Sequence, residues 1–313
     1  MSSIRIGSRG STLALAQARW VQKQIENNRP DLRVELAIIK TSGDRFVDAS
    51  LWAIGGKGLF TKEIEDALLR GEIDIAVHSM KDLPTELPPG LVIAAIPERE
   101  DPRDVLVSRR GNSLKTLPAG TKIGTGSLRR EAQLRHYRRD LHVVPIRGNV
   151  DTRLKKLDEG EVDALVMAAA GLNRIGQAGR IAEFIAADIC VSAVAQGALA
   201  VEARVDASVR ETLSFLHDAK ADTEVSAERA FLSRLGGGCQ VPVGARATLK
   251  ENKLHILGIV AEPDGSSLCR GEKSGAPGDA VGLGRELAEQ LLNQGADIML
   301  RNLDPRGNQY GAA

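Results

Sequence analysis

Short runs of aliphatic and β-branched residues alternate with longer amphipathic stretches along the chain, and this alternation predicts an α/β fold. The first run, residues 4–7, leads through a Gly/Ser turn into a helical pattern over residues 13–25. A second run, residues 122–125, leads through a similar turn into a helical pattern over residues 128–137. Each stretch therefore predicts a strand, a turn and a helix in that order.

The two stretches also match further along the chain. Arg-Pro-Asp-Leu at 29–32 and Arg-Arg-Asp-Leu at 138–141 each precede a predicted strand, and Gly-Glu-Ile-Asp at 71–74 is echoed by Gly-Glu-Val-Asp at 160–163. This order favours two α/β domains of like topology, although strand–helix–strand units also give such look-alikes by chance. Two like domains commonly face each other across a cleft, and open α/β sheets bind ligands beyond the carboxyl ends of their strands. We therefore expect the binding site in a cleft between the two domains.

The last third of the chain predicts a smaller α+β domain. Residues 192–205 follow the second repeat and are expected to return the chain to the first domain. A helical pattern at 223–235 then ends at three glycines. Three strands are predicted after it, at 243–249, 253–261 and 268–273. A final helix is predicted at 279–294, and the tail after Leu303 is predicted to be disordered. The predicted domains are residues 1–97 with 198–216, residues 98–197, and residues 219–313.

Composition excludes several classes of protein. The 313 residues carry 42 Lys and Arg against 41 Asp and Glu, and only 3% are aromatic, which argues against a nucleic-acid partner. The sequence shows neither a secretory pattern nor an apolar run long enough to span a bilayer, so we expect a cytoplasmic protein without a membrane partner. The three cysteines have no C-x-x-C spacing, which favours reduced thiols and no metal site.

Arginines gather at the predicted strand-to-helix turns. Arg9 stands beside Ser8 and Ser11, Arg129 and Arg130 follow Thr125 and Ser127, and a further junction holds Arg147 and Arg153. Helix N-termini and guanidinium groups both bind carboxylate or phosphate. Any one of these arginines can equally be a solvated surface charge, but the set at matched turns predicts a site for a small ligand with several negative charges.

Two other segments could carry chemistry. Asp82 ends the segment that follows a predicted strand at 73–77, and the neighbouring Lys81 favours its ionised form, which can hold a developing cation or move a proton. A helix-capping role for Asp82 is equally compatible with the spacing, and His78 is expected to pack or to hydrogen-bond structurally. Gly-Gly-Lys-Gly at 55–58, which contains Lys57, lacks the spacing of a phosphate loop and is either a lid or an anion contact.

The cysteines differ in their surroundings. Cys239 follows three glycines, which favours an accessible thiol on a tight or mobile loop, and it is either a covalent attachment point or a small buried filler. Cys190 and Cys269 lie in apolar or strand contexts, so we expect both to be buried fillers.

Taken together, these segments resemble the porphobilinogen deaminase (hydroxymethylbilane synthase) family from Ile4 to about Leu300. The resemblance lies in ordered motifs at residues 7–11, 55–60, 76–83, 98–104, 124–130, 147–150 and 237–242. It implies two domains built like periplasmic binding proteins and a smaller C-terminal domain. It also implies a monomeric transferase of haem biosynthesis that joins four porphobilinogen molecules head to tail, with loss of ammonia, into the linear tetrapyrrole hydroxymethylbilane.

The resemblance further implies a dipyrromethane cofactor held by a thioether to Cys239, and Asp82 as the catalytic residue. The other implied cofactor contacts are Phe60, Lys81, Thr125, Ser127, Arg129, Arg130 and Gly171. The implied substrate contacts are Arg9, Ser11, Lys57, Arg147, Arg153, Arg174 and Gln196.

The chain departs from the family pattern at a few positions: Ala53 stands for a usual Lys, Gly126 for a frequent Ser, and Ser192 and Ala195 for the usual Pro and Gly. The alternative is a two-domain anion-binding protein without catalysis. It accounts for the repeat and the arginines but not for Cys239 on its glycine loop.

Overall fold

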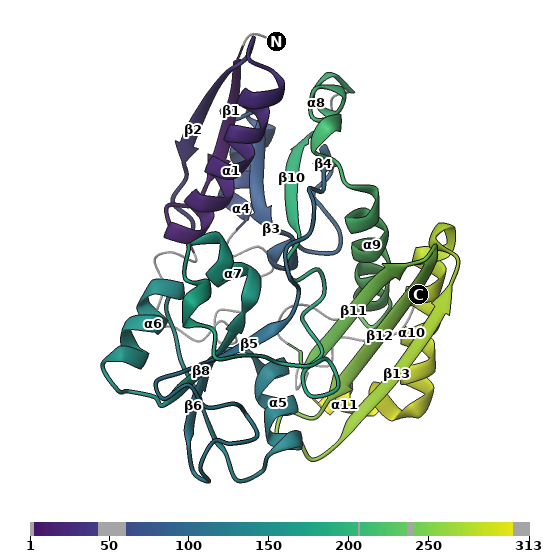
Figure 1. Cartoon of the computed structure of the whole chain (residues 1–313). Coiled ribbons are helices and arrows are strands. Elements are labelled where there is room, and N and C mark those ends of the chain that lie inside the picture. Colours follow the sequence, from purple (N-terminus) through teal and green to yellow (C-terminus); the bar gives the residue numbers. More distant parts are fainter. Residues whose placement is uncertain (1–2, 43–60, 206, 237–240, 303–313) are drawn as a thin grey trace. The chain divides into compact units, whose positions relative to one another are not determined.

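The computed structural model of the chain describes residues 3–42, 61–205, 207–236 and 241–302 (Figure 1). The chain forms two compact units, residues 1–100 with 197–222 and residues 101–196 with 223–313. The second unit contains two separate sheets, so the second and third predicted domains fall within it. The predicted boundaries between three domains stay a prediction.

The first unit is built on a mixed five-stranded sheet in the order β2-β1-β3-β10-β4. Its strands β1 to β4 and β10 are Ser3–Ser8, Arg33–Ile38, Ile75–Ser79, Leu91–Ala95 and Leu199–Arg204. β1 is parallel to β2 and β3, whereas β10 lies antiparallel between β3 and β4. The expected return of the chain to the first domain is thereby confirmed, since β10 follows the whole second repeat. The remaining elements are α1 (Thr12–Asn28), α4 (Lys62–Leu69), η1 (Met80–Asp82), α8 (Ala207–Thr212) and η3 (Ser214–Leu216).

Helix α1 shows how the sequence pattern produces an element. The side chain of Ser11 caps its N-terminus by accepting a hydrogen bond from the backbone N–H of Ala14 at 3.3 Å. Ala18, Val21 and Ile25 share one face of the helix and are fully buried in the core of the first unit. The cap also fixes where the turn after β1 ends.

The second unit repeats this topology in a sheet ordered β7-β6-β8-β5-β9. Its strands β5 to β9 are Asp104–Ser108, Lys122–Thr125, His142–Pro145, Ala164–Ala168 and Glu183–Phe184. Helices α5 (Leu128–Tyr137), α6 (Val150–Asp158), α7 (Ala169–Arg174) and η2 (Ala178–Arg180) accompany it. β6 is parallel to β7 and β8, and β5 is antiparallel to β8. The matching strand orders confirm two α/β domains of like topology.

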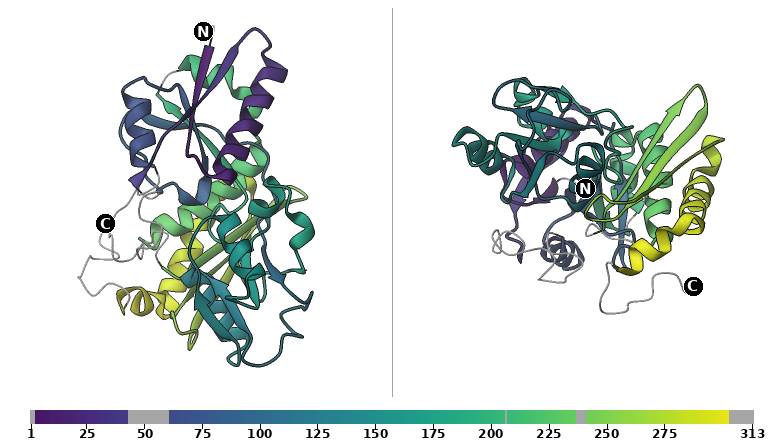
Figure 2. Two further views of the ribbon diagram at one scale, coloured as in Figure 1. Left: turned by 90° about the vertical axis from the view of Figure 1, so that its left-hand side faces the viewer. Right: turned by 90° about the horizontal axis from the view of Figure 1, so that it is seen from below.

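A three-stranded antiparallel sheet, β11 (Val243–Lys250), β12 (Lys253–Ala261) and β13 (Leu268–Gly275), forms the C-terminal part of the second unit (Figure 2). Helices α9 (Ala219–Arg234) and α10 (Ala280–Leu291) pack on one face of this sheet. Their side chains come so close to Gly258 that an added Cβ there would lie 2.7 Å from Phe231 and 3.0 Å from Leu287. These elements confirm the predicted smaller α+β part, and with it the predicted fold class.

Two predicted helix boundaries differ from the structure. α9 begins at Ala219, before the predicted start at 223, because the Asp218 carboxylate accepts a hydrogen bond from the N–H of Ala221 at 2.6 Å and caps the helix. The predicted helix at 279–294 is interrupted: α10 ends at Leu291, and Gly295 adopts φ 100° within a π-helical turn, η5 (Leu292–Ala296), before α11 (Asp297–Asn302). The tail predicted to be disordered lies outside the described residues.

Candidate functional site

The first unit brings two predicted segments to one edge of its sheet. Residues 8–11 follow β1 and residues 80–82 follow β3, and these two strands are parallel neighbours with Gly7 paired to Ala76. Ser11 serves as the cap of α1, and the Arg9 side chain is half-buried. Because parallel strands end on the same side, Arg9, Ser11, Lys81 and Asp82 belong to one edge.

Asp82 is the last residue of η1 and is exposed, whereas Lys81 is half-buried. Buried Met80 anchors the turn, since its N–H donates to the carbonyl of Ala198 at 3.0 Å. The N–H of Leu83 in turn donates to the carbonyl of Met80 at 3.1 Å. Asp82 therefore does not cap one of the described α-helices. Its carboxylate is presented to solvent from an anchored turn.

His78 is a buried residue of β3, as predicted. Its Nε2 lies 3.0 Å from Oε2 of Glu202 on β10, and both side chains are buried. Glu65 on α4 is buried nearby, and its pKa is raised by burial and then by the charge of Glu202. This cluster of two carboxyl groups and one imidazole joins α4 and β10 to β3, the strand that leads to Asp82. Neither glutamate was predicted from the sequence to have a role.

The second unit gathers its predicted residues at the matching edge of its sheet. Thr125 ends β6 and Ser127 follows it, Arg147 follows β7, and Gly171 and Arg174 lie on α7 after β8. The Ser127 side chain caps α5 by accepting from the N–H of Arg130 at 3.5 Å. Gly171 and Arg174 are half-buried.

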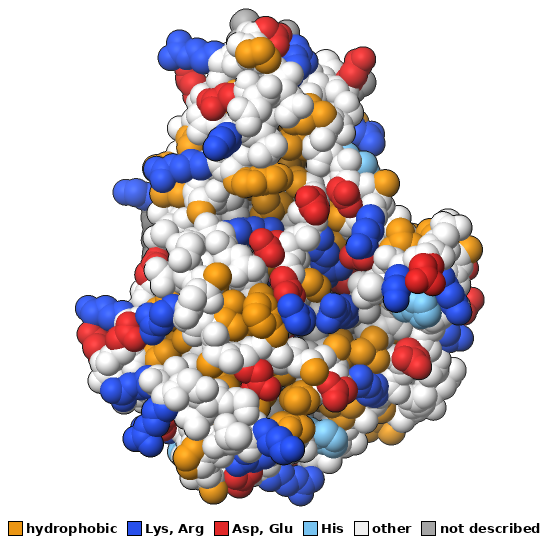
Figure 3. All heavy atoms as spheres, in the orientation of Figure 1, with side chains coloured by type: hydrophobic (Ala, Val, Ile, Leu, Met, Phe, Trp, Pro, Cys, Tyr) orange, Lys and Arg blue, Asp and Glu red, His pale blue; other side chains and the backbone are white. Residues whose placement is uncertain are grey.

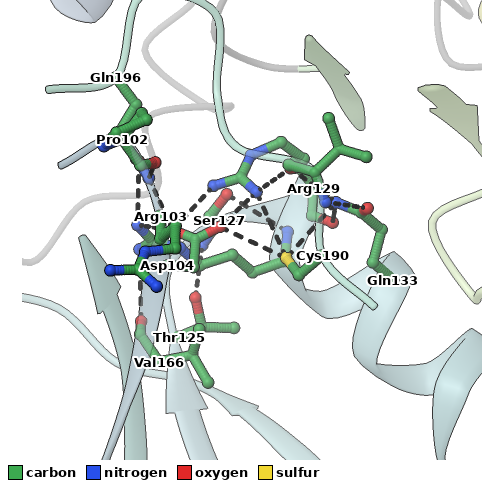
Figure 4. Close-up of polar contacts among 12 residues, drawn as sticks. Pro102, Arg103, Asp104, Thr125, Ser127, Arg129, Gln133, Val166, Cys190 and Gln196 are labelled. Atoms are coloured by element: carbon green, nitrogen blue, oxygen red, sulfur yellow. Dashed lines mark hydrogen bonds and ion pairs between the residues drawn. The ribbon is translucent and has the colours of Figure 1, made fainter. Parts of the chain in front are cut away.

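A buried acid, Asp104, organises the arginines at this edge (Figure 4). Asp104 begins β5 opposite Ala168, and this antiparallel pairing places it at the edge where β6 and β8 end. Its Oδ2 lies 2.6 Å from Nη1 of Arg129, and its Oδ1 lies 2.7 Å from Nη2 of Arg130. No role was predicted for Asp104 from the sequence, although it stands within the motif at 98–104.

Electrostatics follow from this arrangement. Burial alone would raise the pKa of Asp104, but the charges of Arg129 and Arg130 outweigh burial and hold that pKa well below its usual range. Burial lowers the pKa of Arg129, but the charge of Asp104 and the contacts with Asp104 and Cys190 together outweigh burial, so the net shift is upward. Asp104 is therefore an ionised carboxylate between two guanidinium groups.

Cys190 joins the same cluster. Its Sγ donates to Oδ2 of Asp104 at 3.3 Å and accepts from Nη1 of Arg129 at 3.4 Å. Burial first, and then the negative charge of Asp104, raises the pKa of the thiol to about 12. The prediction of buried fillers is confirmed for Cys190 and Cys269. Cys190 packs in a hydrophobic core cluster of the second unit, as its apolar sequence context predicts, and Arg129 and Asp104 also approach its thiol from α5 and β5.

Gln196 completes the cluster. Its Nε2 donates to Oδ1 of Asp104 at 2.9 Å and to the carbonyl of Pro102 at 2.7 Å, and its Oε1 accepts from Nη2 of Arg130 at 3.3 Å. The side chain is fully buried. The amide is therefore held in one orientation against the arginine pair.

Arg147 and Arg153 differ from Arg129 and Arg130, which share the carboxylate of Asp104. Nε of Arg153 donates to the carbonyl of Gly148 at 2.8 Å, and among the described residues no carboxylate lies within ion-pair distance of either guanidinium. Burial, and then the positive charges of Arg130 and Arg147, lowers the pKa of Arg153 to about 10. Asp104 offsets only one positive charge of the four arginines. The donor set consequently fits a ligand that carries several carboxylates.

Several predicted residues lie outside the described part of the chain, namely Ala53, Lys57, Phe60 and Cys239. Within the described ranges no helix is long and apolar enough to cross a membrane, and no His, Cys, Asp and Glu side chains group as metal ligands would. On the face drawn in Figure 3, basic and acidic side chains lie interspersed, in keeping with the net charge of +1.

Comparisons with known proteins agree on one family. Residues 4–211 match the family model "Porphobilinogen deaminase, dipyromethane cofactor binding domain", and residues 223–293 match "Porphobilinogen deaminase, C-terminal domain". The chain is 53% identical over 304 residues to porphobilinogen deaminase of Syntrophotalea carbinolica, covering 97% of this chain and 96% of that protein. It is 50% identical over 302 residues to that of Syntrophus aciditrophicus, covering 96% and 99%. A solved structure of the methionine-binding protein MetQ aligns with a TM-score of 0.44 and 14% identity, covering 69% of this chain and 89% of that one.

Proposed function

The chain belongs to the porphobilinogen deaminase family, and we propose on that basis which of its residues perform the reaction of a hydroxymethylbilane synthase. The reaction is a transfer: four porphobilinogen molecules are joined head to tail with release of four ammonia molecules, and one water molecule supplies the terminal hydroxyl group of the linear tetrapyrrole hydroxymethylbilane. The enzyme serves tetrapyrrole biosynthesis.

One observation supports placing the binding of substrate carboxylates at the edge of the second sheet where Arg130, Arg147 and Arg153 lie. Arg153 is largely buried, and burial together with the positive charges of Arg130 and Arg147 lowers its pKa to about 10. A carboxylate ligand relieves that repulsion. Each pyrrole of the substrate carries an acetate and a propionate, so a growing chain offers a carboxylate for every guanidinium. We assign Arg9, Arg147, Arg153 and Arg174 to substrate carboxylates, with Ser11, Lys57 and Gln196 as further contacts.

The same chemistry fits a dipyrromethane cofactor, whose pyrroles bear the same acidic side chains. When bound, this group supplies the pyrrole carbon to which the first substrate is joined. We assign Lys81, Thr125, Ser127, Arg129, Arg130, Phe60 and Gly171 to its contacts. We place the attachment at Cys239, through a thioether. The burial of Cys190 and Cys269, with the raised pKa of both thiols, supports this choice.

Asp82 is proposed as the catalytic residue. Departure of ammonia leaves a positive charge on the methylene carbon and ring of the substrate. An ionised carboxylate stabilises that charge more than it stabilises the neutral substrate, and such differential binding lowers the barrier. The same carboxylate can accept the ring proton that leaves after the carbon–carbon bond forms. The exposed position of Asp82 on an anchored turn supports this role.

We further propose a monomeric, cytoplasmic enzyme that acts without nucleic acid or membrane. That the two sheet edges face one ligand stays a prediction, as do the boundaries of three domains. The alternative of an anion-binding protein without catalysis is not favoured, because both parts of the chain match the deaminase family.

The decisive test of the cofactor is the intact mass of the purified chain. We expect the wild-type protein to exceed its sequence mass by an adduct of two pyrrole units, and Cys239→Ser to have the sequence mass and no turnover. Cys269→Ser is the control and should keep both adduct and activity. A fully active wild-type chain without an adduct would contradict the proposed cofactor and its attachment.

A further inference from the structure

A fully buried carboxylate, Glu228 on α9, has no part in the roles assigned above. Its Oε2 accepts a hydrogen bond from the backbone N–H of Ala195 at 2.6 Å, and its Oε1 accepts one from the N–H of Ala247 at 2.7 Å. Burial of a charged group is tolerated where hydrogen bonds replace the lost water. Glu228 thereby ties the turn before Gln196 to strand β11.

Ala195 needs such an anchor. Its backbone adopts the left-handed conformation, φ 58°, although it carries a Cβ. Conformations of this kind persist where the surroundings fix them. The next residue is Gln196, whose side chain contacts both Asp104 and Arg130. The backbone conformation of Ala195 consequently sets the direction in which the Gln196 amide points.

Strand β11 also contacts residues 191–192, which precede the Ala195–Gln196 turn. The N–H of Ala245 donates to the carbonyl of Ser192 at 3.1 Å. An added Cβ at Gly244 would lie 2.9 Å from the carbonyl oxygens of Val191 and Ser192 and 3.1 Å from Cδ of Arg129. The C-terminal sheet therefore packs directly against the residues that hold the arginine cluster, and Glu228 fixes that packing by hydrogen bonds.

We propose that Glu228 is a positioning residue for this arginine cluster. By holding Ala195 it holds the Gln196 amide, and through Gln196 it orients Asp104 and Arg130 toward a carboxylate ligand. The catalytic part of this proposal rests on the proposed function. The helix that carries Glu228 ends at Arg234, shortly before residues 237–240 with Cys239. Helix α9 thus carries Glu228, which positions the arginine cluster, and its C-terminus precedes the proposed attachment cysteine in the sequence.

Two matched variants separate this role from general stability. In Glu228→Gln the side chain keeps its size, but its NH₂ group cannot accept a hydrogen bond, so one of the two amides loses its acceptor. The control is Glu224→Gln, one turn earlier on α9, where the carboxylate accepts from the N–H of Leu249 at 2.9 Å. Both variants are made in the full-length holoenzyme.

The kinetic prediction concerns both size and coupling. We expect Glu228→Gln to lower kcat/KM for porphobilinogen at least about tenfold, and Glu224→Gln to stay near wild type. Because Glu228 acts through Gln196, the double variant Glu228→Gln/Gln196→Ala should have a kcat/KM close to that of the more impaired single variant. The proposal would be overturned if the fold-loss in kcat/KM of the double variant equalled the product of the two single losses. Unchanged kcat/KM in Glu228→Gln would overturn it as well.

Amide hydrogen exchange gives a readout that does not depend on turnover. Glu228→Gln should speed exchange in the peptide spanning residues 191–196, whereas Glu224→Gln should leave it unchanged. Equal exchange in Glu228→Gln and wild type would overturn the proposal even if activity fell. If the wild-type chain made no tetrapyrrole, the proposed function would fail, and the exchange data would still decide whether Glu228 holds the Ala195–Gln196 turn.

Discussion

Ala195 carries a backbone conformation that a glycine would adopt without strain. Its φ of 58° places the Cβ against the following carbonyl, which costs an L-residue about 1–2 kcal/mol. Its N–H is held by the carboxylate of Glu228, which lies 33 residues further along the chain. The strain is therefore held in place at the residue directly before Gln196.

Ala195→Gly should stabilise the protein by about 0.5–1 kcal/mol. Relief of about 1–2 kcal/mol of strain is partly offset by the greater freedom of glycine in the unfolded chain, about 0.4–1 kcal/mol. Urea unfolding of both proteins measures the difference. Ala193→Gly, two residues earlier and without positive φ, is the control and should destabilise. A less stable Ala195→Gly would show that the turn is not strained.

Asp82→Asn should bind porphobilinogen but lose turnover by about 100- to 1000-fold, because the amide keeps the shape and removes the charge that stabilises the cationic transition state. Steady-state kinetics and ammonia release measure the effect. Glu86→Gln, an exposed carboxylate in the same unit, serves as the control and should be unaffected. Near-normal turnover in Asp82→Asn would remove Asp82 from the mechanism.

Strand β5 and helix α5 are joined by charge as well as by packing. Asp104 at the start of β5 holds two guanidinium groups from the first turn of α5, and all three side chains are buried. Such a cluster is stable only when complete, because removal of the acid leaves buried positive charge without compensation.

Asp104→Asn should therefore lower the free energy of unfolding by about 3–5 kcal/mol. Asp31→Asn, which breaks an exposed pair with Arg29, is the control and should show no measurable change. Denaturant unfolding measures both. An Asp104→Asn variant as stable as wild type would mean that the arginines are compensated by groups other than Asp104.

Periodicity made the regular elements predictable, as helix α5 shows: its predicted and observed bounds, Leu128 and Tyr137, coincide. The antiparallel placement of β10 and β5 was not predictable from local pattern, because β10 pairs with a strand that lies more than a hundred residues earlier in the chain. The role of Asp104 was missed for the same reason, since its partners lie 25 and 26 positions further on. The arginines were found because they stand at recognisable turns.

At the scale of the whole molecule, the two units contain buried acids that respond to pH in opposite directions. Asp104 in the second unit has a lowered pKa, so its stabilising contribution is present above its unfolded value of 3.8 and is lost as pH falls. Glu65 in the first unit has a raised pKa. Its contribution is present below the unfolded value of 4.5 and is lost as pH rises through the folded value.

Variants of Glu65 and Asp104 should change the pH dependence of the free energy of unfolding in opposite directions. Relative to wild type, Glu65→Gln should gain stability as the pH is raised from 4 to 8, because it removes a buried group that resists ionisation. The penalty of Asp104→Asn should instead shrink below pH 4. Unfolding free energies across this range test both slopes. Parallel profiles for the wild type and Glu65→Gln would show that Glu65 does not titrate abnormally.

The position of β10 bears on how the protein is made. β4 pairs with the first sheet only through β10, and β10 ends at Arg204, beyond all strands of the second sheet. On the ribosome, the sheet formed by residues 104–184 is therefore complete before the sheet that begins at Ser3. The N-terminal sheet keeps an unpaired edge on β3 until β10, its last strand in chain order, has been made. During synthesis, the later half of the sequence repeat thus completes its sheet first, while the earlier half keeps an open strand edge, a feature that favours aggregation, until β10 has been made.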